Sequence, residues 1–443
     1  MKKILLYTTL LFCAFGAAAQ TSKPYEMMVN GVKVIVQPSG NEIVEIQTVI
    51  KGGVQNYSDA KAGIEKLALK ALTECGTLKD DKNTFKNKLD KLSAYVGGST
   101  GMDYATFRMN CIKSDFDAVW PLYVDALTIP KFDAKEFVRI KQDAINDIKA
   151  EESNPDGALF NMAKQTAFAG KAYAKNPSGT VASVTALTPA DTKNYFKSVF
   201  NRGRVFIVVV GDIDRNVLEQ KLGALIAKIP QGTPFIPKKE TYNPTANSFK
   251  AKEKENATNY IMGITSAPLP GTPDYDAFVL AMDIFYNKHF LEIRSKRGLS
   301  YAPQTFFARG LTPFSALYVS TTEPNKYIAA ARALIDTIKM KGFTEEELKN
   351  DKSGFVTEMY YRQETNSATA GSFVSNEVIN NNWKRALTVK EDLGKVSLDD
   401  LNRVFKQYIN NITWVYQGDP KKVEAKMYTQ KETPLPPKET KAF

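Results

Sequence analysis

One amphipathic helix carries the residues that first raise a question of chemistry. Residues 63–77 read GIEKLALKALTECGT. A helical period places Lys66, Leu69 and Lys70 together, opposite the apolar face. A protonated lysine has three donors and no lone pair, and a leucine cannot take up a proton. This side of the helix is therefore either plain surface or the remnant of a lost site, and it cannot bind a metal cation. The apolar face consists of Ile64, Leu67, Ala68, Ala71, Leu72 and Cys75.

The rest of the chain offers no histidine-based metal site. His289 is the one histidine in 443 residues, and zinc needs several ligands from His, Cys, Asp or Glu. We expect this histidine to be packed or to cap a helix end. Beyond the N-terminal segment the cysteines are Cys75 and Cys111. We expect two buried free thiols there, with a disulfide as the alternative.

The N-terminus has the pattern of a secretory signal peptide. In MKKILLYTTLLFCAFGAAAQ, two lysines precede an apolar run, and small alanines precede Gln20. We predict that residues 1–19 are a signal peptide cleaved near Ala19, and that the protein is periplasmic or otherwise exported. Processing at Cys13 as a lipoprotein is disfavoured, because Phe12 stands where a small residue is expected. No later apolar run reaches the ~20 residues of a membrane span.

The formal net charge of +11 does not point to a nucleic acid. Lysines are spread through the expected helices and the tail rather than clustered with aromatic residues, which is typical of solvated helix faces. An exported location also argues against a nucleic-acid partner. A basic cavity that attracts acidic peptides is the alternative.

Internal similarity indicates a duplicated domain. Three pairs of segments match in order at a spacing of about 210 residues, and each pair shares its apolar spacing. Two strand-like runs end in the same Gly-Asp dipeptide. We therefore predict two homologous domains in one chain. The matching segments are 131–154 with 342–365, 187–200 with 396–409, and 204–213 with 412–420.

The predicted boundaries follow from this repeat. Residues 20–230 form the N-terminal domain and residues 254–430 the C-terminal domain. Between them, residues 231–253 are rich in proline and lack periodicity, which is typical of a linker. Residues 431–443 are expected to form a flexible tail.

Each half mixes strands and helices in blocks rather than in strict alternation. This pattern favours an α+β fold in which a mostly antiparallel sheet is packed with helices. In the first half we expect strands at 32–39, 43–53, 104–112 and 204–210, and helices at 63–75, 83–94, 115–128, 133–152, 154–169 and 189–199.

A further motif resembles a known family. Residues 290–303, FLEIRSKRGLSYAP, are similar to the Arg…Tyr segment in the second domain of the insulinase/pitrilysin zinc peptidases. The duplication extends the resemblance over nearly the whole chain. Active members carry His-x-x-Glu-His on a first-domain helix, and here those positions are Lys66, Leu69 and Lys70. The third ligand position, a glutamate in active members, is Asp147. The resemblance thus implies the peptidase fold without zinc in this chain.

The same resemblance implies roles for two retained residues. Arg294 would hold backbone carbonyls of a substrate, and Tyr301 would donate to the oxyanion of the tetrahedral intermediate. The alternative is that Arg294 pairs with a surface acid and that Tyr301 packs in a strand, since SYAPQTFF has strand character. In some family members the zinc-bearing and Arg…Tyr-bearing halves are separate chains. The chain is then inactive alone and acts on peptides in a heterodimer with a zinc-bearing homologue.

A second retained segment resembles the edge strand that binds substrate in this family. Within AYVGGSTGMDYATFRMN, residues Gly97, Gly98, Ser99 and Thr100 would pair with an extended peptide by strand addition. The two glycines would allow close approach of a backbone. A simple hairpin turn is the alternative, and the asparagine usual in the family is absent, with Ser99 nearest to its place.

Two other functions remain open from the sequence. One is a non-catalytic scaffold or peptide-binding protein of the same fold, for example a homodimer. The other, weaker hypothesis is a metallopeptidase active by itself. No glycine-rich phosphate loop follows a strand, so no nucleotide cofactor is expected.

Overall fold

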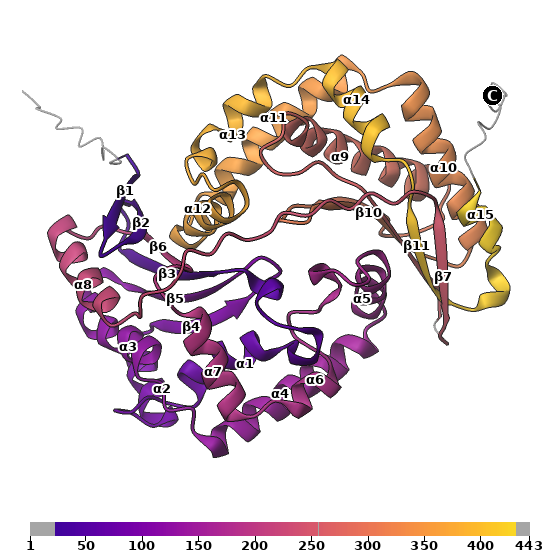
Figure 1. The fold of residues 1–443 in the computed structure, drawn as a ribbon. Coiled ribbons are helices and arrows are strands. Elements are labelled where there is room, and N and C mark those ends of the chain that lie inside the picture. Colours follow the sequence, from indigo (N-terminus) through magenta and orange to yellow (C-terminus); the bar gives the residue numbers. More distant parts are fainter. Residues whose placement is uncertain (1–22, 256, 431–443) are drawn as a thin grey trace, which may run out of the picture.

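The computed structural model describes residues 23–255 and 257–430. The predicted signal peptide, residues 1–19, and the predicted tail, residues 431–443, lie outside the described residues. Two halves, each containing a sheet packed with helices, lie against each other in Figure 1. The predicted α+β class with two similar domains is confirmed. In the described part of the chain, no helix is long and apolar enough to cross a membrane.

The sheet of the first domain has six strands in the order β1-β2-β6-β3-β5-β4. Only the β2–β6 pair is parallel, so the sheet is mostly antiparallel as predicted. Strand β4 lies at one edge with a single neighbour, which leaves one side of its backbone without a partner strand. The bounds are β1 Tyr25–Val29, β2 Val32–Gln37, β3 Ile43–Lys51, β4 Tyr95–Thr100, β5 Tyr104–Ile112 and β6 Val205–Val210.

The sheet of the second domain repeats this topology without an equivalent of β1. Its order is β7-β11-β8-β10-β9, with β7–β11 as the parallel pair. Residues 248–253, the last six of the segment predicted as linker, form β7 and belong to this sheet. The bounds are β7 Ser248–Glu253, β8 Asn259–Thr265, β9 Gln304–Ala308, β10 Phe314–Thr321 and β11 Thr413–Gly418.

The helices of the first domain begin and end close to their predicted positions, because side chains cap their N-termini. Asp133 accepts hydrogen bonds from the first turn of α4, and Asn154 does the same for α5. The bounds are α1 Ile64–Glu74, α2 Lys82–Lys91, α3 Phe116–Thr128, α4 Ala134–Ser153, α5 Pro155–Ala167, α6 Val181–Ala186, α7 Pro189–Val199 and α8 Arg215–Ala227.

One N-terminal cap of the first domain, at α7, has an equivalent in the second domain, at α14. Thr188 and Asp191 form a capping box at α7, and Ser397 and Asp400 form one at α14, in the segments matched by sequence. The bounds are α9 Asp274–Phe290, a π-helix Leu291–Lys296, α10 Pro324–Lys341, α11 Glu345–Arg362, α12 Asn366–Asn380, α13 Arg385–Gly394, α14 Leu398–Tyr408 and α15 Ala425–Thr429.

Each domain places one helix on the sheet of the other domain. Helix α5 of the first domain packs on β8 and β11 of the second sheet, and α12 of the second domain packs on β3 and β6 of the first (Figure 1). Buried Phe373 and Val374 of α12 share a core with Phe206 and Val208 of β6. Each sheet is therefore covered on one face by its own helices and on the other by a helix of the opposite domain.

Buried contacts around the end of α5 and the predicted linker add to this packing between the two domains. Phe168, at the end of α5, packs against Tyr173, against Tyr242 of the predicted linker and against Phe314 of β10. Asp103 accepts a hydrogen bond from the Tyr173 hydroxyl at 2.5 Å and one from the backbone of Leu311, in the second domain, at 3.2 Å. Burial raises the pKa of Asp103 to about 6. The segment predicted as a linker is therefore packed against the domains at Tyr242.

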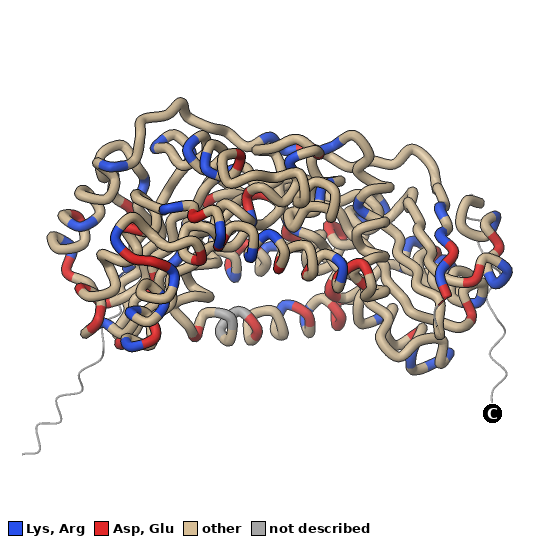
Figure 2. The backbone as a smooth tube through the Cα atoms, turned by 90° about the horizontal axis from the view of Figure 1, so that it is seen from below, with Lys and Arg blue, Asp and Glu red and all other residues tan. Residues whose placement is uncertain are grey.

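The charged residues are interspersed over the molecule. In Figure 2, Lys and Arg positions lie among Asp and Glu positions in both halves. Many of them pair locally, as Lys61 does with Asp191 at 2.8 Å and Arg139 with Asp143 at 2.9 Å. The distribution follows the expectation of solvated, mixed-charge helix faces.

Candidate functional site

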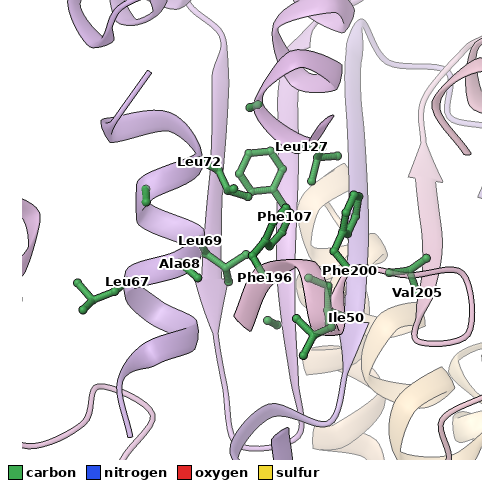
Figure 3. Close-up of a cluster of buried hydrophobic side chains, with 14 of the residues drawn as sticks. Ile50, Leu67, Ala68, Leu69, Leu72, Phe107, Leu127, Phe196, Phe200 and Val205 are labelled. Atoms are coloured by element: carbon green, nitrogen blue, oxygen red, sulfur yellow. The ribbon is translucent and has the colours of Figure 1, made fainter. Parts of the chain in front are cut away.

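Helix α1 packs its Leu69 into the domain instead of presenting it on a surface. Leu69 is only 1% exposed, and Figure 3 shows it directed toward Phe107. A Cβ atom added to Gly98 would lie 2.7 Å from Leu69 Cβ and 3.2 Å from the Phe107 ring. The alternative that this side of α1 is plain solvated surface is therefore wrong, since Leu69 is buried. The reason is the close approach of β4, which only a glycine permits.

The side chains of Lys66 and Lys70 contact other residues of the same domain. Lys66 Nζ donates to Ser178 Oγ at 3.2 Å, and Lys70 Nζ lies 3.9 Å from Asp143 Oδ2 on α4. Asp147, at the third ligand position, is exposed one turn further along α4. Among residues 23–255 and 257–430, no group of three or more His, Cys, Asp or Glu is placed to hold a metal ion. Ammonium groups at these positions repel a cation, so the residues present do not fit a zinc ion.

Sequence reasoning missed the buried acid of this helix, Glu65. It is 1% exposed, and it accepts hydrogen bonds from Tyr195 at 2.6 Å and from Thr100 of β4 at 2.5 Å. Burial raises the pKa of Glu65 above its ordinary value, partly offset by these hydrogen bonds. The available signal was its spacing, since Glu65, Leu69 and Leu72 follow the i, i+4, i+7 rule and form a second buried strip.

We expect Glu65→Ala to destabilise the protein by about 2–4 kcal/mol, because two buried hydroxyl groups lose their acceptor. Glu65→Gln keeps an acceptor. A raised pKa means that the folded chain holds this proton more tightly than the unfolded chain, so the wild type loses stability as the pH rises above the ordinary carboxyl range. The free energy of unfolding of the Gln variant, relative to wild type, should therefore increase between about pH 5 and about pH 8.

Urea unfolding followed by circular dichroism at both pH values measures this difference. Glu219→Gln, at an exposed position of α8, is the matched control and should show no such trend. A Glu65→Gln difference that is constant with pH would contradict a protonation-dependent role for Glu65.

The structure brings Arg294 and Tyr301 together. The guanidinium carbon of Arg294 lies 4.1 Å from the centre of the Tyr301 ring and 5.0 Å from that of Phe290, within the range of cation–π contact. Tyr301 is 78% exposed. The expectation of a strand at SYAPQTFF is wrong for its first residues, because β9 begins only at Gln304 and Tyr301 lies in the preceding bend.

Local structure explains how this pair forms. Gly298, with φ +62°, ends the π-helix, and its N–H donates to the Arg294 carbonyl at 3.1 Å. The chain then turns back so that Tyr301 lies under Arg294. The nearby carboxylate of Glu292 forms ion pairs with Arg297 at 2.7 Å and with Lys296 at 3.4 Å. The surface acid next to Arg294 therefore pairs with these two residues. A guanidinium can stack on an aromatic face and still use its planar fork of N–H donors.

The predicted peptide-binding residues lie on the edge strand β4 of the other domain. Ser99 bonds with Thr106 at 2.8 Å, and Thr100 donates to Glu65, so both side chains are used within the domain. Gly98 lets β4 lie close to Leu69 of α1, and a Cβ at Gly97 would meet the Tyr95 hydroxyl of the same strand. The open backbone side of β4 is thus the feature left for an extended peptide.

Comparison with known families decides the assignment. Residues 33–180 match the model described as Insulinase (Peptidase family M16), and residues 186–355 match the model described as Peptidase M16 inactive domain. The chain belongs to the insulinase family. The second match begins within the first domain, at residue 186, and the two matches together confirm the resemblance seen in the sequence.

Individual relatives and solved structures are similar to this M16 chain over most of its length. The chain is 23% identical over 440 residues to a non-peptidase homolog, YmxG, of Helicobacter pylori, covering 95% of this chain and 100% of that protein. An M16 inactive domain from Pseudomonas fluorescens has a TM-score of 0.81 at 18% identity and covers 94% of this chain and all of its own. The periplasmic protease PqqL of Escherichia coli has a TM-score of 0.76 at 15% identity, with 94% of this chain matching 49% of PqqL.

The remaining singled-out residues are structural. His289 is fully buried, its Nε2 lies 3.2 Å from the Tyr327 hydroxyl, and burial lowers its pKa to about 3. The prediction of a packed histidine is confirmed. Cys75 and Cys111 are buried and unbonded to each other, and burial raises the pKa of each thiol to about 12. The prediction of two buried free thiols is also confirmed.

Proposed function

We propose that this chain is the non-zinc-binding subunit of an exported insulinase-type peptidase. It pairs with a zinc-bearing homologue and supplies Arg294 and Tyr301 in trans for peptide hydrolysis. The observation that carries the proposal is the stacking of Arg294 on the exposed Tyr301, together with a helix α1 that has Lys66, Leu69 and Lys70 at the family's functional positions. Donor groups without a metal are useful where another chain brings the metal.

In this complex each retained residue has one role. The Tyr301 hydroxyl would donate to the oxyanion of the peptide bond under attack, and a zinc ion held by the partner would supply the activated water. Arg294 donates from its planar fork to backbone carbonyls of the substrate. Extended peptides add to the open side of β4 at Gly97, Gly98, Ser99 and Thr100.

Export and domain boundaries are parts of the same proposal. The pattern of residues 1–19 favours secretion, and one structural neighbour is described as periplasmic. The units are an N-terminal domain at 20–230, a linker at 231–253 whose last part is β7, and a C-terminal domain at 254–430.

A non-catalytic scaffold or peptide-binding protein of the same fold is the second candidate. The relative described as a non-peptidase homolog, similar over its whole length, favours it. The two candidates differ in what the chain associates with. A scaffold can self-associate into a homodimer, whereas an accessory subunit requires a homologue with an intact His-x-x-Glu-His helix.

We expect Tyr301→Phe to reduce peptide cleavage by the complex about 100-fold, because one oxyanion donor is lost. The chain is co-expressed with a homologue that carries His-x-x-Glu-His, preferably one encoded by a neighbouring gene. The kcat for a fluorogenic peptide is then measured on the purified complex.

Tyr361→Phe is the matched control, since Tyr361 is also exposed, at 68%, but lies on α11. Its kcat should equal that of the wild type. If Tyr301→Phe leaves kcat unchanged in a stable complex, the catalytic role is wrong. If light scattering shows a self-dimer that does not bind the zinc-bearing homologue, the scaffold function is favoured instead.

A further inference from the structure

A large cavity lies in the second domain and takes no part in the proposed peptidase function. It has a volume of about 1140 Å³, is partly open, and is lined mainly by residues of α9, α11, α12 and α13, helices that Figure 1 labels. This volume is slightly above the range of about 300–1,000 Å³ that is typical of small-molecule pockets. The aliphatic and aromatic part of its wall includes Val279, Ile284, Leu291, Phe355, Ile379 and Leu393.

The internal repeat gives this cavity a counterpart in the first domain. Helix α9 stands between β8 and β9 as α1 stands between β3 and β4, and α11 matches α4 in sequence. In the first domain, the space between these two helices is where Lys70 approaches Asp143. In the second domain, acids come from both helices, Asp283 from α9 and Asp351 from α11. The two domains therefore differ in charge at the same place.

The wall of the cavity has an excess of acidic groups. Its bases Lys288 and Arg385 are held in ion pairs with Glu347 and Asp276 respectively. The wall has five acidic and three basic side chains in total, so it is formally negative by two charges. The remaining charged members of the wall are Asp283, Asp351, Glu358 and Arg309, of which Asp283 and Glu358 have interaction partners of their own.

Two buried acceptors on this wall have no hydrogen-bond donor among the described residues. They are Oδ2 of Asp351 and Oδ1 of Asn380. The orientation of the Asn380 amide is set by its neighbours, because its Nδ2 donates to Asn376 Oδ1 and the Asn376 amide donates to the Ser372 carbonyl. The Asn380 oxygen is therefore an acceptor that requires a donor from elsewhere. Buried acceptors without donors cost free energy, and both belong to the same cavity.

We propose that this cavity binds a cationic nitrogen group on an apolar stem, that is, an alkylammonium or guanidinium group. Such a group has several donors and no acceptor, which complements Asp351 and Asn380. Its apolar stem packs on the aliphatic wall, and its charge offsets the acidic excess. The group can come from a free amine or from a Lys or Arg side chain of a peptide. This site is independent of the proposed role of Arg294 and Tyr301.

Isothermal titration calorimetry of the purified chain without a partner tests the site. The ligands are 1,5-diaminopentane, the peptide acetyl-Ala-Ala-Lys-Ala-Ala-amide, and the same peptide with norleucine in place of lysine. We expect one of the two amines to bind and the norleucine peptide not to bind. Binding of the diamine alone identifies a free amine as the ligand, and binding of the lysine peptide identifies a peptide side chain.

Two variants localise the binding. Asp351→Asn removes the buried charge with little change of shape and should weaken binding at least 10-fold. Gly354→Leu should weaken binding by placing a side chain in part of the cavity, since Gly354 lines the wall and a Cβ there meets no atom within 4 Å. A helix tolerates leucine better than glycine, so this variant should fold.

Matched controls are Asp90→Asn, which removes an exposed acid of the first domain, and Gly371→Leu, which changes a glycine of α12 with equally open surroundings. Both should bind as the wild type does, and thermal melts confirm that each variant is folded. Failure of both amines to bind, equal binding of the norleucine peptide, or unchanged binding by Asp351→Asn would overturn the proposal.

Discussion

Leu69→Glu is expected to lower the free energy of unfolding by about 3–5 kcal/mol, because it places an unpaired carboxylate in an apolar contact. Leu69 is 1% exposed, and the backbone of Gly98 closes over it. No side-chain donor is prepared there, since Thr100 and Tyr195 already bind Glu65. Urea unfolding monitored by circular dichroism gives the change.

The control is Leu69→Met, which nearly conserves volume and should cost less than about 1.5 kcal/mol. An unfolding midpoint of Leu69→Glu equal to that of wild type would show that the contact with β4 is loose. The expected result also bears on zinc. Restoring His-x-x-Glu-His by mutation requires this same glutamate, so the reverted helix should destabilise its own domain rather than regain a metal site.

Phe168→Ala is expected to destabilise the protein by about 3–5 kcal/mol, the usual cost of deleting a large buried aromatic side chain. Phe168 is fully buried and contacts the first domain, the linker and the second domain through three other rings. Its loss should affect both domains together. Urea unfolding measured by tryptophan fluorescence and by circular dichroism should give coincident transitions for wild type and variant.

An exposed residue of the predicted linker provides the comparison. Ile236 is 87% exposed, and Ile236→Ala should change the free energy of unfolding by no more than about 0.5 kcal/mol. Two separate transitions in the Phe168→Ala variant, with one domain keeping its wild-type midpoint, would contradict the view that the domains form one cooperative unit.

Features encoded by local spacing could be predicted from the sequence. The apolar period fixes α1, and the capping residues Asp133, Asn154 and Thr188 set the starts of three helices to within a residue or so. The repeat identified two domains because its matches preserve caps as well as apolar positions. Strand β7 was missed because SFKAKE is polar and exposed, and its strand conformation comes from pairing with β11.

Features made by residues distant in sequence could not be predicted in this way. The burial of Leu69 depends on Gly98, and the burial of Glu65 depends on Thr100 and Tyr195. No local period reveals such partners. The contact between Arg294 and Tyr301 was accessible only in part, since the motif gave the residues but not the turn at Gly298 that stacks them.

The reciprocal placement of α5 and α12 means that neither half is a self-sufficient piece. A chain severed between Ala227 and Ser248 would leave each fragment with a bare apolar sheet, whose cover is carried by the other fragment. Each of the duplicated halves therefore depends on the other to cover its sheet. A substitution in one half is constrained by the side chains of the other half that pack against it.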